Sequence, residues 1–321
     1  MIHPLLLSVI PSVIQLTLEH PQPAKVPAKA ANRERRRGAD KGRQRTMERV
    51  SRRGRVSDAQ LTGLAAHLTE RDRQIARDCY EHRVFTTRQL ERLHFSDPRA
   101  GRRRLLTLYR LRVLDRFRPR LPLGDGSAPY HWVLDEAGAQ IVAAQQGIDR
   151  QQLRYSHTAA LSVADSAKLA HHIEVNDLFT RLARDAAQAG GALAEWYGER
   201  TMHSILHAIT PDGYGVLRLP DASPIHLLLE LDRATEPAAR LREKARRYAR
   251  SIPRSTLRQA NPLILLAVPS VARARTATAA VANTGAPIAV TVWSAASTGS
   301  VFAIVTEAAG TTSRVPLSAP R

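Results

Sequence analysis

The chain has 321 residues, a formal net charge of +19 at pH 7 and a hydrophobic content of 43%, which suffices for two folded units with ordinary cores. A positive excess of this size indicates a polyanionic partner, with nucleic acid first and an anionic membrane surface second, although a basic tail added for solubility is the plain alternative. Cys79 is the only cysteine, which excludes an intrachain disulfide, a zinc finger and a cysteine-ligated cluster, and predicts a reducing, cytoplasmic location.

Residues 1–57 predict a disordered basic arm. The apolar stretch 5–18 is interrupted by Pro11 and is shorter than the roughly 20 residues that span a bilayer, and it lacks the charged start of a secretory signal. We therefore expect no membrane partner, and we hypothesise that this stretch is either disordered or lies upstream of the true start, with Met47 as an alternative start. Arginine and lysine dominate 33–55, so the arm either holds DNA phosphates without reading sequence or is a solvated tail.

Residues 58–150 predict a winged helix-turn-helix domain. Thr69 followed by Asp72, and Thr86 followed by Gln89, each resemble a capping box that opens a helix. A third helix is expected after Ser96 or Asp97. Leucines at 105, 108 and 111 form its buried stripe. The turn 124–127 between two apolar runs then predicts a hairpin, and three helices followed by a hairpin are the winged-helix plan.

The third helix is the predicted recognition helix. At about 100° per residue, Arg103 lies about 200° from Leu105, so it points away from the core stripe. Guanidinium groups on such a face bind guanine edges or phosphates, whereas the alternative is a solvated charged face. The predicted DNA-binding residues are Arg99, Arg102, Arg103 and Arg110 on the helix and Arg116, Arg118 and Arg120 on the wing.

Residues 151–310 predict an α/β domain with a mixed sheet, followed by a disordered tail at 311–321. The expected elements are a long helix at 163–189, strands at 193–197, 213–219 and 225–232, a helix at 236–252 capped by Thr235, a strand at 262–268, a helix at 272–282, and strands at 288–293 and 301–306. Strands that first follow one another and then alternate with helices are typical of a mixed sheet.

Carboxylates gather at one end of this predicted sheet. In strand 225–232, Glu230 and Asp232 share one face, and Asp212 lies at the mouth of the preceding strand. Buried like charges need a cation or donors, so we expect either a Mg²⁺ site at Asp212 and Glu230 or a structural ion-pair cluster. Lys244 on the following helix faces the sheet and is expected within reach of the carboxylates.

This order of elements resembles the PD-(D/E)xK nuclease fold. The resemblance implies magnesium binding by Asp212 and Glu230. It also implies a lysine that positions the attacking water, but Asp232 stands where that family has its lysine. Lys244 is the substitute that the resemblance leaves, so the predicted catalytic set is Asp212, Glu230, Asp232 and Lys244.

The adjacent histidines at 171 and 172 are further candidate metal ligands. On a helix they diverge by about 100°, so they do not readily face one ion. Glu174, from the same helix, is a further candidate for a nuclease-like site. The alternative for all three is ordinary helix surface and packing.

Several segments together resemble the replication-relaxation family. The matching stretches are LTERDRQIA at 68–76, TTRQLERLHF at 86–95, HHIEVNDLF at 171–179, PDGY at 211–214 and LELDRATEP at 229–237. The resemblance implies a plasmid or mobile-element protein that acts in replication, relaxation or transfer, with double-stranded DNA and replication or transfer proteins as partners. Three functions remain open: a non-catalytic DNA-binding and scaffolding protein, a magnesium-dependent nicking endonuclease, and a transcriptional regulator whose C-terminal domain senses a signal or forms a homodimer.

Overall fold

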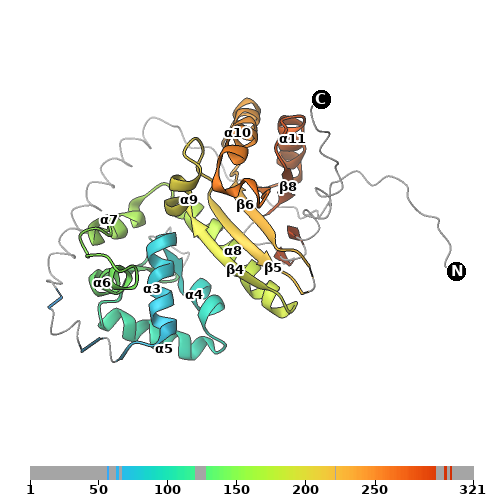
Figure 1. Cartoon of the computed structure of the whole chain (residues 1–321). Helices are drawn as coiled ribbons and strands as arrows, with labels where there is room; N and C mark the ends of the chain where they lie inside the picture. Colours follow the sequence, from blue (N-terminus) through green and yellow to red (C-terminus); the bar gives the residue numbers. More distant parts are fainter. Residues whose placement is uncertain are drawn as a thin grey trace, which may run out of the picture.

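A computed structural model describes residues 56–57, 63–64, 67–119, 128–220, 222–293, 300–301 and 304–305. The chain is a mixed α/β protein in which a mainly helical unit lies beside a unit built on a larger sheet (Figure 1). The predictions for the arm up to residue 55, for Arg120, for the turn at 124–127 and for the tail at 311–321 lie outside these residues.

The first unit combines five helices with a small sheet in the described part of the chain. Its elements are α3 (Glu70–His82), β1 (Phe85–Thr86), α4 (Thr87–His94), α5 (Pro98–Arg110), β2 (Leu114–Phe117), β3 (His131–Leu134), α6 (Glu136–Gln145) and α7 (His157–Leu161). The strands pair antiparallel in the order β1-β3-β2. Strand β1 is too short for its apolar pattern to predict it.

The helix starts in this unit follow from local chemistry. Both predicted capping boxes are confirmed, with Thr69 and Thr86 each exchanging hydrogen bonds with the residue three positions later. Asp97 caps α5 through the amides of residues 99 and 100, and Pro98 occupies the first turn. Leu105 and Leu108 of α5 are fully buried in the core of the unit.

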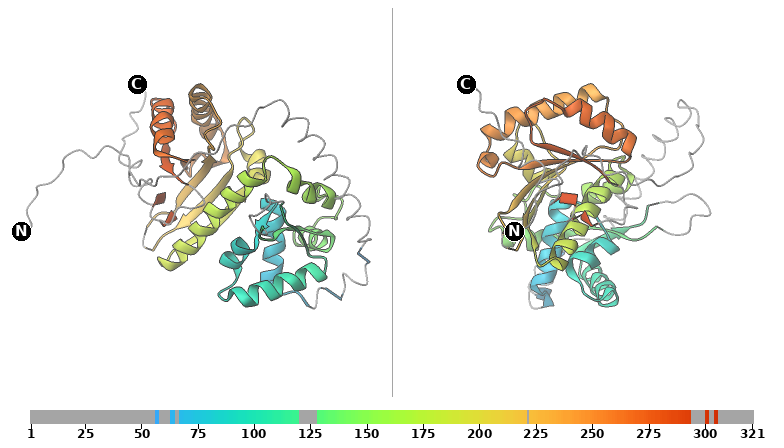
Figure 2. Two further views of the ribbon diagram at one scale, coloured as in Figure 1. Left: turned by 180° about the vertical axis from the view of Figure 1, so that it is seen from behind. Right: turned by 90° about the vertical axis from the view of Figure 1, so that its right-hand side faces the viewer.

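The second unit is a five-stranded mixed sheet with helices on both faces (Figures 1 and 2). Its elements are α8 (Leu169–Gln188), β4 (Ala192–Gly198), α9 (Glu199–Ile205), β5 (Gly213–Arg218), β6 (Ile225–Leu231), α10 (Ala238–Ser251), β7 (Leu263–Val268), α11 (Val271–Val281) and β8 (Ile288–Val292). The strand order is β4-β5-β6-β7-β8, antiparallel from β4 to β6 and parallel from β6 to β8. This architecture confirms the predicted mixed sheet.

Alternation along β6 decides which helix covers which face. Leu227 and Leu229 pack in one core with Phe179 of α8, whereas Leu228 packs on the other face with Tyr248 of α10. The predicted two-faced pattern of this strand is thereby confirmed. Among the described residues, no helix is long and apolar enough to cross a membrane.

Two predicted helix starts were wrong. Helix α8 begins at Leu169, because the segment before it forms a separate 3-10 helix (Ser162–Asp165) and the Ser166 hydroxyl then accepts the amide of Lys168. Thr235 caps nothing, since Pro237 disfavours helical backbone at the preceding residue and α10 starts after it.

The strand expected at 301–306 is also wrong. The described residues there, 301 and 304–305, are helical, and the sheet ends with β8 among the described strands. Val301 and Val305, four residues apart, both pack into the α8 core, and the Val301 amide donates to the Asp185 carboxylate at 2.9 Å. Residues four positions apart lie on the same side of a helix. The prediction of a strand was wrong because it relied on the β-branched residues of this segment, which favour strands.

The two units are joined mainly through α8. Asn176 donates its side-chain amide to the carbonyls of His82 and Val84 at 3.3 and 2.7 Å, and Gln89 donates to the Ile173 carbonyl at 2.8 Å. His82 at the end of α3 stacks on Trp196 of β4, with ring centroids 3.7 Å apart. Because hydrogen bonds are directional, the bonds from Asn176 and Gln89 help to fix the orientation of the two units.

Candidate nucleic-acid interface and carboxylate cluster

Helix α5 is held so that one of its faces points outward. Arg104 reaches back to the buried carboxylate of Asp72 on α3, donating from Nε at 2.9 Å. This ion pair and the buried leucines anchor the helix, so Arg104, which adjoins the predicted stripe, is a structural residue. Anchoring of this kind gives the exposed side a fixed position on the surface of the unit.

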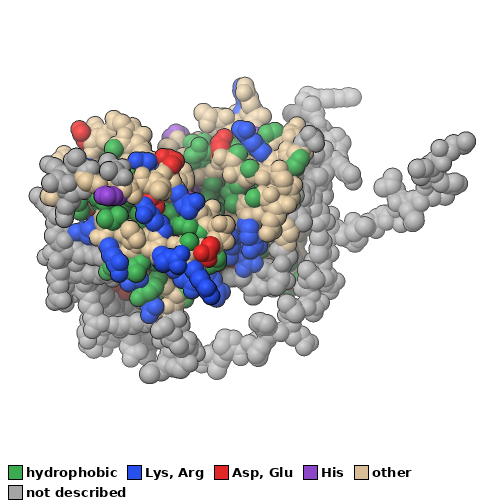
Figure 3. All heavy atoms as spheres, turned by 90° about the horizontal axis from the view of Figure 1, so that it is seen from below, with side chains coloured by type: hydrophobic (Ala, Val, Ile, Leu, Met, Phe, Trp, Pro, Cys, Tyr) green, Lys and Arg blue, Asp and Glu red, His purple; other side chains and the backbone are tan. Residues whose placement is uncertain are grey.

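The predicted arginines on α5 all lie on the exposed face. Arg99, Arg102, Arg103 and Arg110 are exposed. Arg102 is 3.3 Å from Glu91, but in the described part of the chain no ion pair joins an acid to any of the other three. Seen from below, on the side where α5 lies in Figure 1, the surface carries a gathering of Lys and Arg side chains (Figure 3).

The strands beside α5 extend this basic surface through stacked guanidinium groups. Arg116 lies over the rings of Tyr109 and Tyr130, at 4.6 and 3.9 Å from their centroids. Arg118 is exposed and lies over Tyr130 as well, at 3.9 Å. A guanidinium stacked on an aromatic face keeps its edge N–H groups free for an anion.

In the second unit, Asp212 lies just before β5 and is held on both sides. Its Oδ2 accepts the amide of Leu231 at 2.7 Å, and its Oδ1 is 2.9 Å from Nε2 of His171 on α8. Burial lowers the pKa of His171, but the hydrogen bond and charge of Asp212 outweigh burial and leave this pKa raised.

Glu230 is buried beneath two partners from α10. Lys244 donates to its Oε2 and the Tyr248 hydroxyl donates to its Oε1, and only 3% of the residue is exposed. Burial, reinforced by the charge of Asp212, raises the pKa of Glu230 to about 7. The structure thus brings Asp212, Glu230 and Lys244 together at one end of the sheet.

Asp232 is directed to a different partner. Arg273 of α11 donates to its Oδ2, and the amide of Ala234 donates to its Oδ1 at 3.0 Å. The structure therefore does not bring Asp232 into the cluster formed by Asp212 and Glu230, and its contacts close the end of β6 onto α11.

The arrangement of Asp212 and Glu230 does not fit a shared Mg²⁺ ion well. Both oxygens of Glu230 already accept a hydrogen bond, and burial raises the pKa of this carboxyl, which disfavours the ionised form that a cation needs. Mg²⁺ requires ionised, accessible oxygen ligands in near-octahedral geometry.

Sequence reasoning missed a neighbouring group of ligand-type side chains. His171, Glu199 and Asp212 each offer one ligand atom, and these atoms lie within 4.8 Å of one another. Glu199 begins α9, an unpredicted helix, so no sequence pattern placed it beside the other two. Helical spacing predicted only that His171 and His172 do not face the same ion, and it did not pair His171 with Asp212. Glu174 lies 3.4 Å from Arg233 instead.

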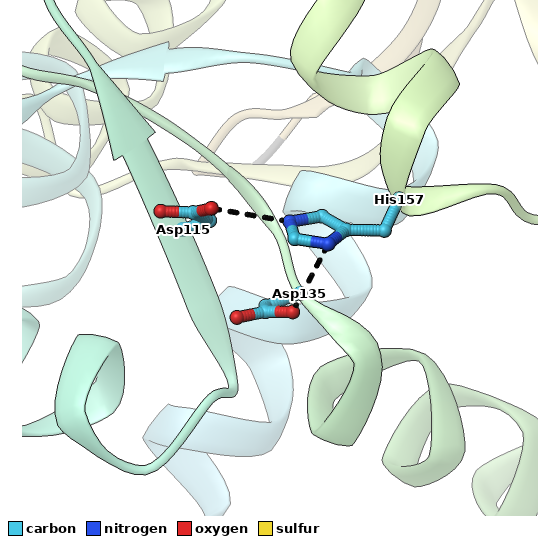
Figure 4. A group of neighbouring side chains, drawn as sticks. All are labelled: Asp115, Asp135 and His157. Atoms are coloured by element: carbon cyan, nitrogen blue, oxygen red, sulfur yellow. Dashed lines mark hydrogen bonds and ion pairs between the residues drawn. The ribbon is translucent and has the colours of Figure 1, made fainter. Parts of the chain in front are cut away.

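A second such group, at Asp115, Asp135 and His157, is fully buried in the first unit (Figure 4). The two ring nitrogens of His157 face Asp115 at 3.2 Å and Asp135 at 3.4 Å. Arg112 binds both oxygens of Asp135, at 2.7 and 2.9 Å. Because Arg112 binds Asp135 and the His157 ring lies between the two carboxylates, we interpret the cluster as an internal polar network that ties α7 to the β2–β3 hairpin.

Comparison with known proteins identifies a family. The sequence model described as replication-relaxation matches residues 77–263, more than half of the chain. A search of curated proteins and a search of solved structures found no match. The matched range includes α5, His171 and the Asp212–Glu230–Lys244 cluster.

Proposed function

Because the chain belongs to the replication-relaxation family, we propose that it binds double-stranded DNA of a plasmid or other mobile element during replication, relaxation or transfer. In this proposal the first unit acts as a winged helix, with α5 as the recognition helix and β2–β3 as the base of the wing. Three helices followed by an antiparallel hairpin support that interpretation.

One observation carries the proposal: the arginine face of α5 is exposed and available. Arg99, Arg103 and Arg110 are exposed and make no ion pair within 4 Å in the described part of the chain, although the charge of Arg103 acts on the neighbouring Asp97. In DNA, the phosphates and the guanine edges are the groups that such exposed guanidinium groups bind best.

The test is duplex binding by full-length protein over a range of salt concentrations. Arg99→Ala combined with Arg103→Ala removes two exposed charges one turn apart. Each lost phosphate contact should reduce the slope of log K against log salt by about 0.9, so we expect a reduction of about 2 if both contact phosphates. Fluorescence anisotropy with a labelled duplex measures both the affinity and the slope.

Arg242→Ala with Arg246→Ala is the matched control. These arginines are also exposed and four residues apart, but on α10 of the second unit, so the net charge change is identical. We expect this variant to bind like the wild type. Equal weakening in both double variants, or in neither, would contradict docking through α5. Sequencing of DNA fragments protected by the protein would then separate an origin-binding role from promoter regulation.

A second candidate, a DNA nicking endonuclease, is favoured by the convergence of Asp212, Glu230 and Lys244. The combination of two carboxylates and a lysine at the end of a mixed sheet supports the resemblance to the PD-(D/E)xK fold. In this candidate, Lys244 holds Glu230 and the carboxylate of Asp212 holds the end of β6 through the Leu231 amide, and a cation and a scissile phosphate would bind at this edge of the sheet. The poor fit for Mg²⁺ makes it the weaker of the two.

Nicking of supercoiled plasmid in the presence of Mg²⁺ or Mn²⁺ tests the second candidate. We expect Asp212→Asn and Glu230→Gln to abolish nicking, while Glu195→Gln, an exposed acid on β4, leaves it unchanged. Absence of nicking by the wild type under all metal conditions, with DNA binding intact, would reject the endonuclease and leave the binding function.

A further inference from the structure

We propose that His171, Glu199 and Asp212 form a binding site for a divalent transition-metal ion such as Mn²⁺ or Zn²⁺, a site that shares Asp212 with the carboxylate cluster but does not use Glu230. The three ligand atoms lie within 4.8 Å of one another. They come from three elements, since His171 belongs to α8, Glu199 begins α9 and Asp212 precedes β5.

The spacing of these atoms is close to that of ligands around one ion. With metal–ligand distances near 2.1 Å, neighbouring ligand atoms lie about 3 to 4 Å apart. Nε2 of His171 and Oδ1 of Asp212 are 2.9 Å apart, so a small side-chain adjustment admits an ion between them. Glu199 lies within the same range of both.

The Asp212 side chain is held by a contact that does not use its ligand atom, and the backbone around Glu199 is held by α3. The Leu231 amide fixes Asp212 through Oδ2 and leaves Oδ1 directed at His171. Glu81 of α3 accepts the amides of Gly198 at 2.9 Å and Thr201 at 3.3 Å, on either side of Glu199. A site supported in this way loses little side-chain entropy when an ion binds.

The site opens into a pocket at the junction of the two units. Besides the three ligands, its lining includes Glu81, His82, Arg83, His172, Val175 and Asn176. All three ligands are partly exposed, which leaves room for water molecules to complete the coordination.

The donor set selects the class of ion. One imidazole nitrogen with two carboxylate oxygens suits Mn²⁺ or Zn²⁺, whereas Mg²⁺ prefers oxygen ligands alone. Glu230 is excluded from the set because Lys244 and Tyr248 occupy both of its oxygens. The proposal requires neither DNA binding nor nicking, so it stands or falls independently of both.

Titration of Mn²⁺ into untagged, full-length protein, followed by the loss of the free-ion signal in electron paramagnetic resonance, tests the site. We expect one Mn²⁺ per chain, competition by Zn²⁺ and weak competition by Mg²⁺. His171→Gln and Glu199→Gln should each weaken binding by at least about tenfold, since changes even to groups around metal ligands cost 10- to 100-fold. Glu195→Gln should bind like the wild type.

Two results would overturn the proposal. One is the absence of stoichiometric Mn²⁺ or Zn²⁺ binding by a wild-type protein whose unfolding is cooperative. The other is binding that Glu230→Gln weakens while His171→Gln and Glu199→Gln do not, because that pattern would move the ion to the Asp212–Glu230 pair. Far-ultraviolet circular dichroism of each variant establishes that a loss of binding is not a loss of fold.

Discussion

Stability in mild acid should depend in part on His82, a buried histidine at the junction of the units. The His82 ring is 7% exposed and stacks on Trp196. Burial lowers its pKa from 6.5 to about 4, although the charges of Asp78 and Glu81 pull in the opposite direction. The native protein therefore keeps this imidazole neutral where an unfolded chain would protonate it.

The sign and size of the effect follow from this pKa. Between pH 6.5 and about 4 the unfolded chain binds a proton that the folded chain does not, so His82 costs no stability above pH 6.5 and stability is lost as the pH falls through this window. A displacement from 6.5 to about 4 corresponds to about 3 kcal/mol. That is a large share of the stability of a typical domain.

The assay is urea unfolding of the wild type and of His82→Gln at intervals from pH 7.5 to pH 4. We expect the difference between their free energies of unfolding to be constant above pH 6.5 and to shift by about 3 kcal/mol in favour of the variant at pH 4. His207→Gln, at an exposed position, controls for the loss of a histidine. Parallel curves for His82→Gln and wild type across the whole range would refute the reasoning.

Two further changes probe the first unit. Gly138→Ala would place a Cβ 2.3 Å from the Val113 carbonyl oxygen. Although alanine has the better helix propensity, we expect the free energy of unfolding in urea to fall by about 2 kcal/mol. An unchanged unfolding midpoint would show that α6 shifts without cost. His157→Ala leaves Asp115 and Asp135 with one buried partner fewer, and we expect about 3 kcal/mol of destabilisation, whereas a loss below 1 kcal/mol would mean that Arg112 alone neutralises the cluster.

Local chemistry made much of the first unit predictable. A capping box involves residues only three positions apart, so the starts of α3 and α4 are determined by Thr69 and Thr86 wherever the helices pack. The exposed face of α5 followed equally from helical periodicity, because the leucine stripe fixes which arginines point away from the core. Arg104 is the exception, since its partner Asp72 lies on another helix.

The carboxylate site was predictable only in part. Alternation along β6 placed Glu230 on one face, and the helical arc of α10 placed Lys244 opposite it, and both relations depend on repeat geometry within one element. The same alternation put Asp232 beside Glu230, but the sequence contained no sign that Arg273, forty-one residues later, would bind it.

Sequence alone thus determined the caps of α3, α4 and α5, the two-faced strand and the outward-facing arginines, since each depends on residues within a few positions of one another. Tertiary structure decided that Glu199 meets His171 and Asp212, that His82 stacks on Trp196, and that 301 and 304–305 are helical. These contacts join elements far apart in the chain. Their free energy arises from burial and pairing that exist only after the units have docked, so no local pattern encodes them.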